Sequence, residues 1–294
     1  MTYDSSLNPI AAEKFALDLN EALLAKGGVT DGTYEVFGCG NANAMNIGSL
    51  MKVPSMTKQT SANTNVVPGL STYANVTITP EKFTLKIPVD AFSKLDSNVD
   101  IRNKTVEQAA MSVRGQKDQI IIDALVSAAA AGGFPSTNTI AKTIGGSNTG
   151  MNKAKMRAVA NLFVKNNVAM DDACGLINSQ SLLDLVGDLE SAQYNLLDSS
   201  GPTRQGAVEQ IYGIGNLKVI GNPVSDYAGL SLASNTRQNF FWSKRTVAAV
   251  IKKEIDVKFM DDPATGGEAV FAYLYMGAAV VKDDGIVLVN THEA

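Results

Sequence analysis

The stretch TVEQAAMSVRGQKDQIIIDALVSAAAA, residues 105–131, carries apolar residues at three- and four-residue steps without interruption. Thr105 and Gln108 have the spacing of a capping box, which predicts the start of a helix, and the Gly-Gly-Phe-Pro sequence at 132–135 predicts its end. At 1.5 Å per residue, such a helix is about 40 Å long and has only a narrow apolar stripe along one side. A helix of this length needs a broad surface to lie against.

The composition indicates a globular protein with a substantial core. The chain has 294 residues, of which 45% are hydrophobic and 18% are charged, enough for one large or two ordinary domains. The net charge is −4, and the lysines and arginines are spread along the sequence, so no basic stripe for nucleic acid and no polybasic membrane patch can be recognised. No apolar stretch approaches the roughly 20 residues of a membrane span, and the first residues lack the features of a signal peptide. We therefore expect a soluble protein made in the cytosol.

Residues that build most metal and redox sites are scarce. The two cysteines, Cys39 and Cys174, are far apart and form no CxxC pair, and Cys174 lies in an apolar run that predicts a small buried side chain. A metal site or a histidine-based triad would need the single histidine, His292, close to the end of the sequence. We expect no disulfide, no metal and no cofactor.

The first hundred residues are predicted to form an N-terminal arm and a hairpin that extend from the body of the molecule. Residues 8–26 have an apolar helical face, which predicts an amphipathic N-terminal arm, and residues 30–48 predict an extended strap. Two strand-like arms follow, Leu50 to Lys58 and Val76 to Val89, on either side of a polar tip at Gln59 to Asn75. Because a lone two-stranded ribbon is marginally stable in water, we expect this hairpin to be stabilised by a neighbouring subunit.

After the long helix, the pattern changes to mixed helix and strand. A helix over Lys153 to Lys165, a buried strand over Ala173 to Asn178 and a helix over Ser181 to Glu190 form an αβα element that needs a sheet partner. Alternating strands follow from Phe240, and the last of them are predicted to form a closing hairpin with its turn at 283–285. A sheet made from these C-terminal strands is the expected bed for the long helix.

Motifs for catalysis are weak. The glycine-rich segment 145–150 lacks the GK[ST] ending of a phosphate-binding loop, and 213–215 lacks the third glycine of a dinucleotide fingerprint. Three acidic pairs lie in predicted turns, where turn chemistry is favoured over a shared proton or cation: Asp171-Asp172, Asp261-Asp262 and Asp283-Asp284. Arg114 and Asp118 are one helical turn apart and are expected to pair on the helix surface. We expect no enzymatic activity.

Three local pieces follow the hairpin and the long helix in a characteristic order: GLIN at 175–178 with the helix after it, LKVIGNPV at 217–224, and GAAVVKDDGI at 277–286. Together with the order of elements over nearly the whole chain, they resemble the major capsid protein of tailed bacteriophages, with the Hong Kong 97-like fold. The resemblance implies an α+β fold in five parts: an N-terminal arm (1–48), an extended β-hairpin called the E-loop (49–92), a peripheral domain with the spine helix (93–138), an axial domain (139–235) and the return strands of the peripheral domain (236–294).

The resemblance also implies a structural function. Subunits of this family form hexamers and pentamers of an icosahedral head that encloses double-stranded DNA. Expected partners are further copies of the chain, a separate scaffolding protein, a portal protein and DNA held non-specifically, with no membrane. The expected location is the virion, after assembly in the host cytoplasm. Some members cross-link a hairpin lysine to an asparagine of a neighbour; that set has no match here, so Lys52 and Lys58 are given no such role.

Apolar and aromatic residues of the two arms and of the tip between them are the expected contacts between subunits: Val53, Met56, Tyr73, Val76, Phe83 and Ile87. Two other interpretations stay open. One keeps the fold and makes the chain the shell of an encapsulin-type nanocompartment with a protein cargo. The other makes it an α/β ligand-binding protein or enzyme built on residues 151–235, with a monomer or small oligomer and a ligand-stabilised melting point.

Overall fold

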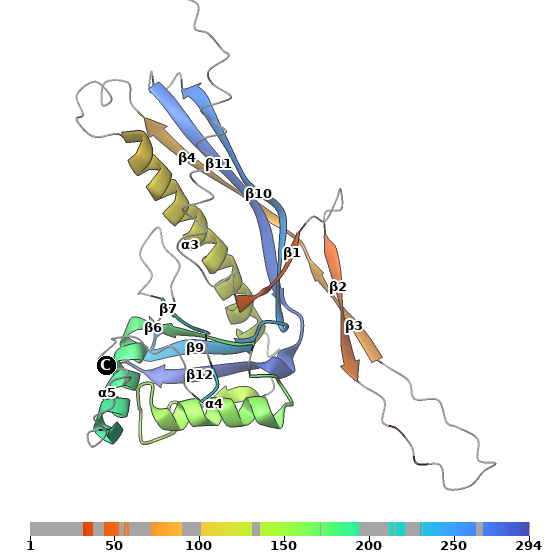
Figure 1. Ribbon diagram of the computed structural model, residues 1–294, viewed down its shortest axis with the longest axis vertical. Coiled ribbons are helices and arrows are strands. Elements are labelled where there is room, and N and C mark those ends of the chain that lie inside the picture. The colour runs from red at the N-terminus through yellow and green to blue at the C-terminus, as the bar shows by residue number, and fades with distance from the viewer. Residues whose placement is uncertain are drawn as a thin grey trace, which may run out of the picture.

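The computed structural model describes residues 32–37, 44–52, 56, 58, 72–89, 101–130, 136–170, 172–193, 212–214, 216–220, 230, 232–262 and 267–293. Figure 1 shows an elongated molecule in which one long helix runs beside a long sheet, a second sheet with two helices lies at the lower end, and a β-hairpin projects to the side. The predicted arm over residues 8–26 lies outside the described residues, as does Cys39. Among the helices in the described ranges, none is both long and apolar enough to cross a membrane.

The first sheet has four strands in the order β1-β10-β11-β4, in which β1 is parallel to β10 and the other pairs are antiparallel. Their bounds are Tyr34–Phe37 for β1, Val247–Asp262 for β10, Gly267–Val280 for β11 and Glu81–Val89 for β4. Helix α3, Ile101–Ala130, lies along this sheet, where Ile121 and Leu125 share a buried cluster with Leu274 and Met276. The predicted bed for the long helix is therefore confirmed, with β4 and β1 added to the C-terminal strands.

The start of α3 differs from the prediction. The helix begins at Ile101, so Thr105 lies one turn inside it with only 5% of its surface exposed. The capping-box interpretation of Thr105 and Gln108 is therefore wrong, because residues three apart also share a face within a helix and the spacing alone does not define its end. Arg114 Nε lies 3.9 Å from Asp118 Oδ2, so the predicted pair is present, but Asp118 is buried and the pair does not lie on the helix surface as predicted.

The second sheet has the order β5-β12-β9-β6-β7, and β8 pairs with β9. Its strands are Thr139–Ile140 (β5), Ile286–His292 (β12), Thr236–Ser243 (β9), Ala173–Asn178 (β6), Asn216–Ile220 (β7) and Leu232–Ala233 (β8). Helices α4, Lys153–Lys165, and α5, Ser179–Gln193, complete the predicted αβα element around β6. Phe163 of α4 and Leu185 of α5 are fully buried in one cluster with Phe241. Strands β9 and β12 thus belong to this sheet, although both lie within 236–294.

Successive side chains of β9 point to opposite faces of the six-stranded sheet, so this strand contributes to both of the large buried clusters. Phe241 faces the cluster with α4 and α5, whereas Phe240 and Trp242 belong to the cluster shared with α3. The Trp242 indole Nε1 donates a hydrogen bond of 2.7 Å to the carbonyl oxygen of Gly32, and a Cβ at Gly32 would lie 3.0 Å from Cys174 Sγ. Cys174 is 3% exposed, so the predicted burial of its side chain is confirmed. The chain that enters β1 is therefore held against the junction between the two sheets.

The predicted closing hairpin is wrong. Strand β11 ends at Val280 and pairs with β10 and β4, whereas β12 pairs with β9 and β5 in the other sheet. The turn at Asp283–Gly285 is present as a 3-10 turn, and Asn138 Nδ2 holds its exit by donating to the Ile286 carbonyl oxygen over 3.2 Å. Residues 286–289 are all buried, so β12 needs a central position with apolar layers on both sides, which a terminal hairpin cannot provide. Of the other acidic pairs, Asp261-Asp262 ends β10 rather than forming a turn.

Candidate functional site

Among the described residues, a two-stranded hairpin extends away from the two sheets. Strands β2, Met45–Lys52, and β3, Thr72–Ile78, pair antiparallel, with Met45 opposite Ile78 and Leu50 opposite Tyr73. In Figure 1 these two strands lead away from the body, and β3 returns to it beside β10 and β11. Asn75 and Thr77 are exposed, and Val76 is half-buried.

The stem of the hairpin packs on its own chain. Ile78 is 2% exposed and forms a cluster with Ala248 and Val250 of β10, against which Met45, Ile47 and Val76 also pack. The expectation that a neighbouring subunit stabilises the hairpin is therefore wrong for the stem, which packs on its own subunit. Because the stem is held, the outer end of the hairpin has a defined direction.

The arm predicted over Val76 to Val89 is divided between two sheets. Strand β3 ends at Ile78, and after Thr79 and Pro80 the chain continues as β4 beside β11. The crossing passes close over Gly277, where an added Cβ would lie 3.0 Å from both Pro80 Cα and the Thr79 carbonyl oxygen. A proline without a backbone N–H suits this step because the chain leaves one ladder before it joins the next.

Gly277→Ala is expected to destabilise the protein by about 1–2 kcal/mol, because the backbone of Thr79 and Pro80 must move to admit the methyl group. Urea unfolding measures the loss. Thr84→Ala, at an exposed position of the same sheet, serves as the control and is expected to change stability by less than about 0.5 kcal/mol. Equal effects of the two substitutions would contradict the close crossing.

The predicted contact residues lie in different places. Met56 is fully exposed, Tyr73 lies in β3 opposite Leu50, and Val76 lies in the stem. Phe83 and Ile87 are in β4, half-buried against the cluster beneath α3. Val53 lies outside the described residues. Whether these residues touch another subunit stays a prediction, and the half-buried positions of Phe83 and Ile87 give them a role in their own subunit as well.

An acidic groove lies between α3 and the sheet. It has a volume of about 600 Å³, and its floor is apolar, with Ile120 and Met276 among the lining residues. Its acidic side chains are Glu81, Asp123 and Asp283. Burial raises the pKa of Asp283, and the nearby charge of Asp284 raises it further. No lysine or arginine lines this groove, so its chemistry suits a positively charged, partly apolar segment.

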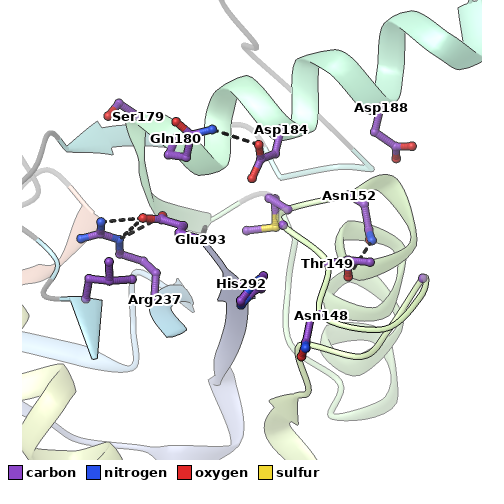
Figure 2. A pocket seen from close by; sticks show the side chains of 14 residues that line it. Asn148, Thr149, Asn152, Ser179, Gln180, Asp184, Asp188, Arg237, His292 and Glu293 are labelled. Atoms are coloured by element: carbon purple, nitrogen blue, oxygen red, sulfur yellow. Dashed lines mark hydrogen bonds and ion pairs between the residues drawn. The ribbon is translucent and has the colours of Figure 1, made fainter. Parts of the chain in front are cut away.

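A larger polar cleft of about 820 Å³ lies at the far end of the six-stranded sheet. Figure 2 shows it between the loop at Asn148–Asn152, the start of α5 and the end of β12. On one side, Arg237 and Glu293 form a buried ion pair, with Nη2 2.6 Å from Oε2, and Arg237 also donates to the Leu230 carbonyl oxygen. Sequence spacing gives no signal for this pair, because the two residues are 56 positions apart.

Lys155 stabilises the loop at Asn148–Asn152, which lies beside this cleft. Its side chain is fully buried, and Nζ donates to the carbonyl oxygens of Thr149 over 2.6 Å and of Gly150 over 2.8 Å. Burial lowers the pKa of Lys155 to about 8, although the charge of Asp184 opposes the shift. The lysine therefore acts as a clamp on its own loop.

This pKa predicts a pH dependence of stability. Below pH 8 the lysine is charged in both the folded and unfolded states, and its burial lowers the free energy of unfolding. Between about 8 and 10.5 the folded state releases the proton while the unfolded state keeps it, so the free energy of unfolding rises with pH. Lys155→Met is expected to remove this rise. Urea unfolding of both proteins at pH 7 and 9.5 checks it, and a difference between them that does not change with pH would contradict it.

The described residues of the cleft hold no recognised catalytic arrangement. In the described part of the chain, no group of three His, Cys, Asp or Glu side chains is arranged so that it could hold a metal ion. His292 Nδ1 lies 3.0 Å from the Asn235 carbonyl oxygen, and Asp188 accepts a 2.7 Å hydrogen bond from the backbone N–H of Lys153 at the start of α4. These groups hold loops and helix ends in place.

Comparisons with known proteins point in one direction. The family described as phage capsid protein matches residues 18–293. Among solved structures, the mature capsid of bacteriophage PhiM1 has a TM-score of 0.63 at 10% identity, over 91% of this chain and 88% of that one. The acid-stable capsid of the Helicobacter pylori bacteriophage KHP30 has a TM-score of 0.63 at 12% identity, over 90% and 89%. A chain from Mycobacterium phage Che8 has a TM-score of 0.60 at 15% identity, over 85% of both. No curated protein sequence matches.

Proposed function

This chain belongs to the phage capsid protein family and is a structural major capsid protein with the Hong Kong 97-like fold; on that premise we propose that it assembles as hexamers and pentamers into an icosahedral head around double-stranded DNA. In this assignment the hairpin β2-β3 is the E-loop, and α3 with the four-stranded sheet is the core of the peripheral domain. The six-stranded sheet with α4 and α5 is the axial domain.

The observation that carries this proposal is the projecting hairpin. Its stem is fixed on Ala248 and Val250, and its strands lead away from the body (Figure 1). A segment held in this way reaches another copy more easily than its own subunit. Each copy then offers one hairpin and receives one, which is a heterologous contact that closes into rings.

Charge supports the acidic groove as the receiving surface. Residues 45–78, from the start of β2 to the end of β3, contain Lys52 and Lys58 and no acidic residue. The groove between α3 and β11 presents Glu81, Asp123 and Asp283. Opposite charges guide the encounter and set the register, while apolar contacts such as Met56 add burial.

The remaining partners follow from the same assignment. A separate scaffolding protein guides curvature, a portal protein occupies one vertex, and packaged DNA is held non-specifically. The shell is assembled in the host cytoplasm and becomes part of the virion. An encapsulin-type shell would share the contacts between subunits and differ in its cargo.

Negative-stain microscopy of the purified chain, with and without a co-expressed scaffolding protein, tests the proposal. Discrete rings or closed particles are the expected result. A monomer that never assembles under either condition would refute it and would favour the ligand-binding alternative. Particles that contain a protein cargo and never DNA would instead support the nanocompartment.

A further inference from the structure

The face of the four-stranded sheet that points away from α3 carries a row of aromatic rings. Residues of β11 alternate, so that Leu274 and Met276 join the cluster under α3 while Phe271, Tyr273 and Tyr275 lie on the opposite face. The hairpin stem packs on this face beside Ala248 and Val250 of β10, together with Ala279 and Val281. Beyond the stem, the three rings are half-exposed, and Phe271 and Tyr273 are stacked with centroids 6.4 Å apart.

Lysines surround these rings. Lys252 Nζ lies 5.0 Å and Lys82 Nζ lies 5.6 Å from the centre of the Tyr275 ring, and Lys86 Nζ lies 5.7 Å from the centre of Phe271. At these distances the ammonium groups are attracted to the ring faces. Lys253 pairs with Tyr275 in the strand register and is exposed. We call the set of Phe271, Tyr273, Tyr275, Lys82, Lys86, Lys252 and Lys253 the aromatic-lysine face.

By strand register the face carries more lysines than acidic residues, in a protein that is acidic as a whole. It gathers four lysines from β4 and β10, and the register adds Lys258 across from Phe271. The same register places two acidic residues on this side, Asp256 across from Tyr273 and Asp262 across from Gly267. The whole chain has a net charge of −4, so most of its negative charge lies elsewhere. A segment rich in Asp and Glu is the complementary partner.

The surface between the lysines is apolar. A hollow of about 330 Å³ is lined by Lys82, Phe83, Thr84, Lys253, Tyr273, Leu274 and Tyr275. Nucleic acid offers phosphates to such a face but no apolar group for the hollow, and the lysines already lie over two of the rings that a base would need for stacking. The hairpin of another copy is unsuitable because its own charges, Lys52 and Lys58, are positive. An acidic segment with apolar anchors fits both features.

We infer that the aromatic-lysine face is the docking site for residues 1–31 of this chain, the segment that precedes the described residues. It contains five acidic residues and two lysines, a net charge of −3. Its apolar side chains at helical spacing include Phe15, Leu19 and Leu23, which supply the anchors that the hollow accepts. It leads into β1, the edge strand beside β10 in the same sheet. This role is independent of how the hairpin docks.

Zero-length carbodiimide cross-linking of the full-length protein, followed by mass spectrometry, tests the inference. Amide links between carboxylates of Glu13, Asp18 or Glu21 and the amines of Lys82, Lys86 or Lys253 are the expected result. Mixing isotope-labelled and unlabelled chains then tells whether the segment comes from the same copy or a neighbour, and either origin supports docking. Absence of such links in folded protein would overturn it.

Charge reversal gives a second readout. In Lys82→Glu/Lys253→Glu, trypsin is expected to cut after Lys14 and Lys26 about tenfold faster than in the unmodified protein, because attraction becomes repulsion. Lys165→Glu/Lys244→Glu, at exposed positions away from the face, is the matched control and should leave the rate unchanged. Equal rates in the two variants would overturn the inference. Loss of duplex DNA binding in the face variant without a change in cleavage would instead assign the face to nucleic acid. Since shells are scored separately by microscopy, failure here leaves the capsid proposal standing.

Discussion

A variant that lacks residues 59–71 is expected to yield folded subunits and to lower the yield of closed shells by at least about a hundredfold. Strand β2 ends at Lys52 and β3 begins at Thr72, so this deletion leaves both strands and the stem cluster intact. None of the removed residues belongs to a described strand or to the stem cluster. Each contact between copies does depend on them in the proposed assembly, and because every subunit makes that contact, a small loss per contact is multiplied around the shell.

Two measurements separate folding from assembly in this variant. Thermal unfolding of the isolated subunit should stay within a few degrees of the unmodified protein, while sedimentation and negative-stain microscopy should show subunits or small oligomers. Replacing 59–71 with a glycine-serine linker of equal length is the control for hairpin length. Shells of normal yield from the deletion variant would refute the role given to the hairpin.

Arg237→Met is expected to lower the free energy of unfolding by about 3–5 kcal/mol, because it leaves Glu293 buried without its partner. Both side chains are at least nine-tenths buried, and the guanidinium also serves the Leu230 carbonyl oxygen, which loses a donor. The pair joins the start of β9 to the residue after β12, so its loss loosens the end of these two neighbouring strands. Denaturant unfolding measures the effect.

The double variant Arg237→Met/Glu293→Leu makes this prediction specific. Replacing both charges by apolar side chains removes the uncompensated carboxylate, so the double variant should recover most of the stability lost in Arg237→Met. A double variant as unstable as the single one would show that packing rather than charge accounts for the loss. Arg245→Met, in an exposed pair with Asp172, is the control and should cost less than about 1 kcal/mol.

Elements with strong local patterns were predicted with accurate bounds. Helix α4 covers Lys153–Lys165 and strand β6 covers Ala173–Asn178, as expected from periodicity and from the apolar run. The side chain of Asn152 caps α4 by accepting from the Lys155 N–H over 2.8 Å. Such signals act over a few residues, so they are present in the sequence itself.

Pairing between strands was predicted less well. The turn at 283–285 suggested a local hairpin, yet Ile286 pairs with Trp242 because β12 is buried on both faces. The alternation of Phe83 and Ile87 was assigned to the projecting ribbon, and the structure places both beneath α3. The sequence of a strand with one apolar face is compatible with pairing to several different strands. Only the packing of the whole core selects one of them.

The functional surfaces also combine features that local sequence determines with features that only the tertiary structure determines. The sequence alone contains the hairpin strands, the spine helix and the order of elements that identifies a capsid subunit, because hydrophobic periodicity and turn residues are local properties. The tertiary structure alone brings Lys82 and Lys253 to either side of Tyr275, pairs Arg237 with Glu293, and gathers three carboxylates in one groove. Charges that are far apart in the sequence form a patch only when the strand order places them side by side. The pKa of Lys155 is lowered by burial, and burial depends on the packing of the whole molecule.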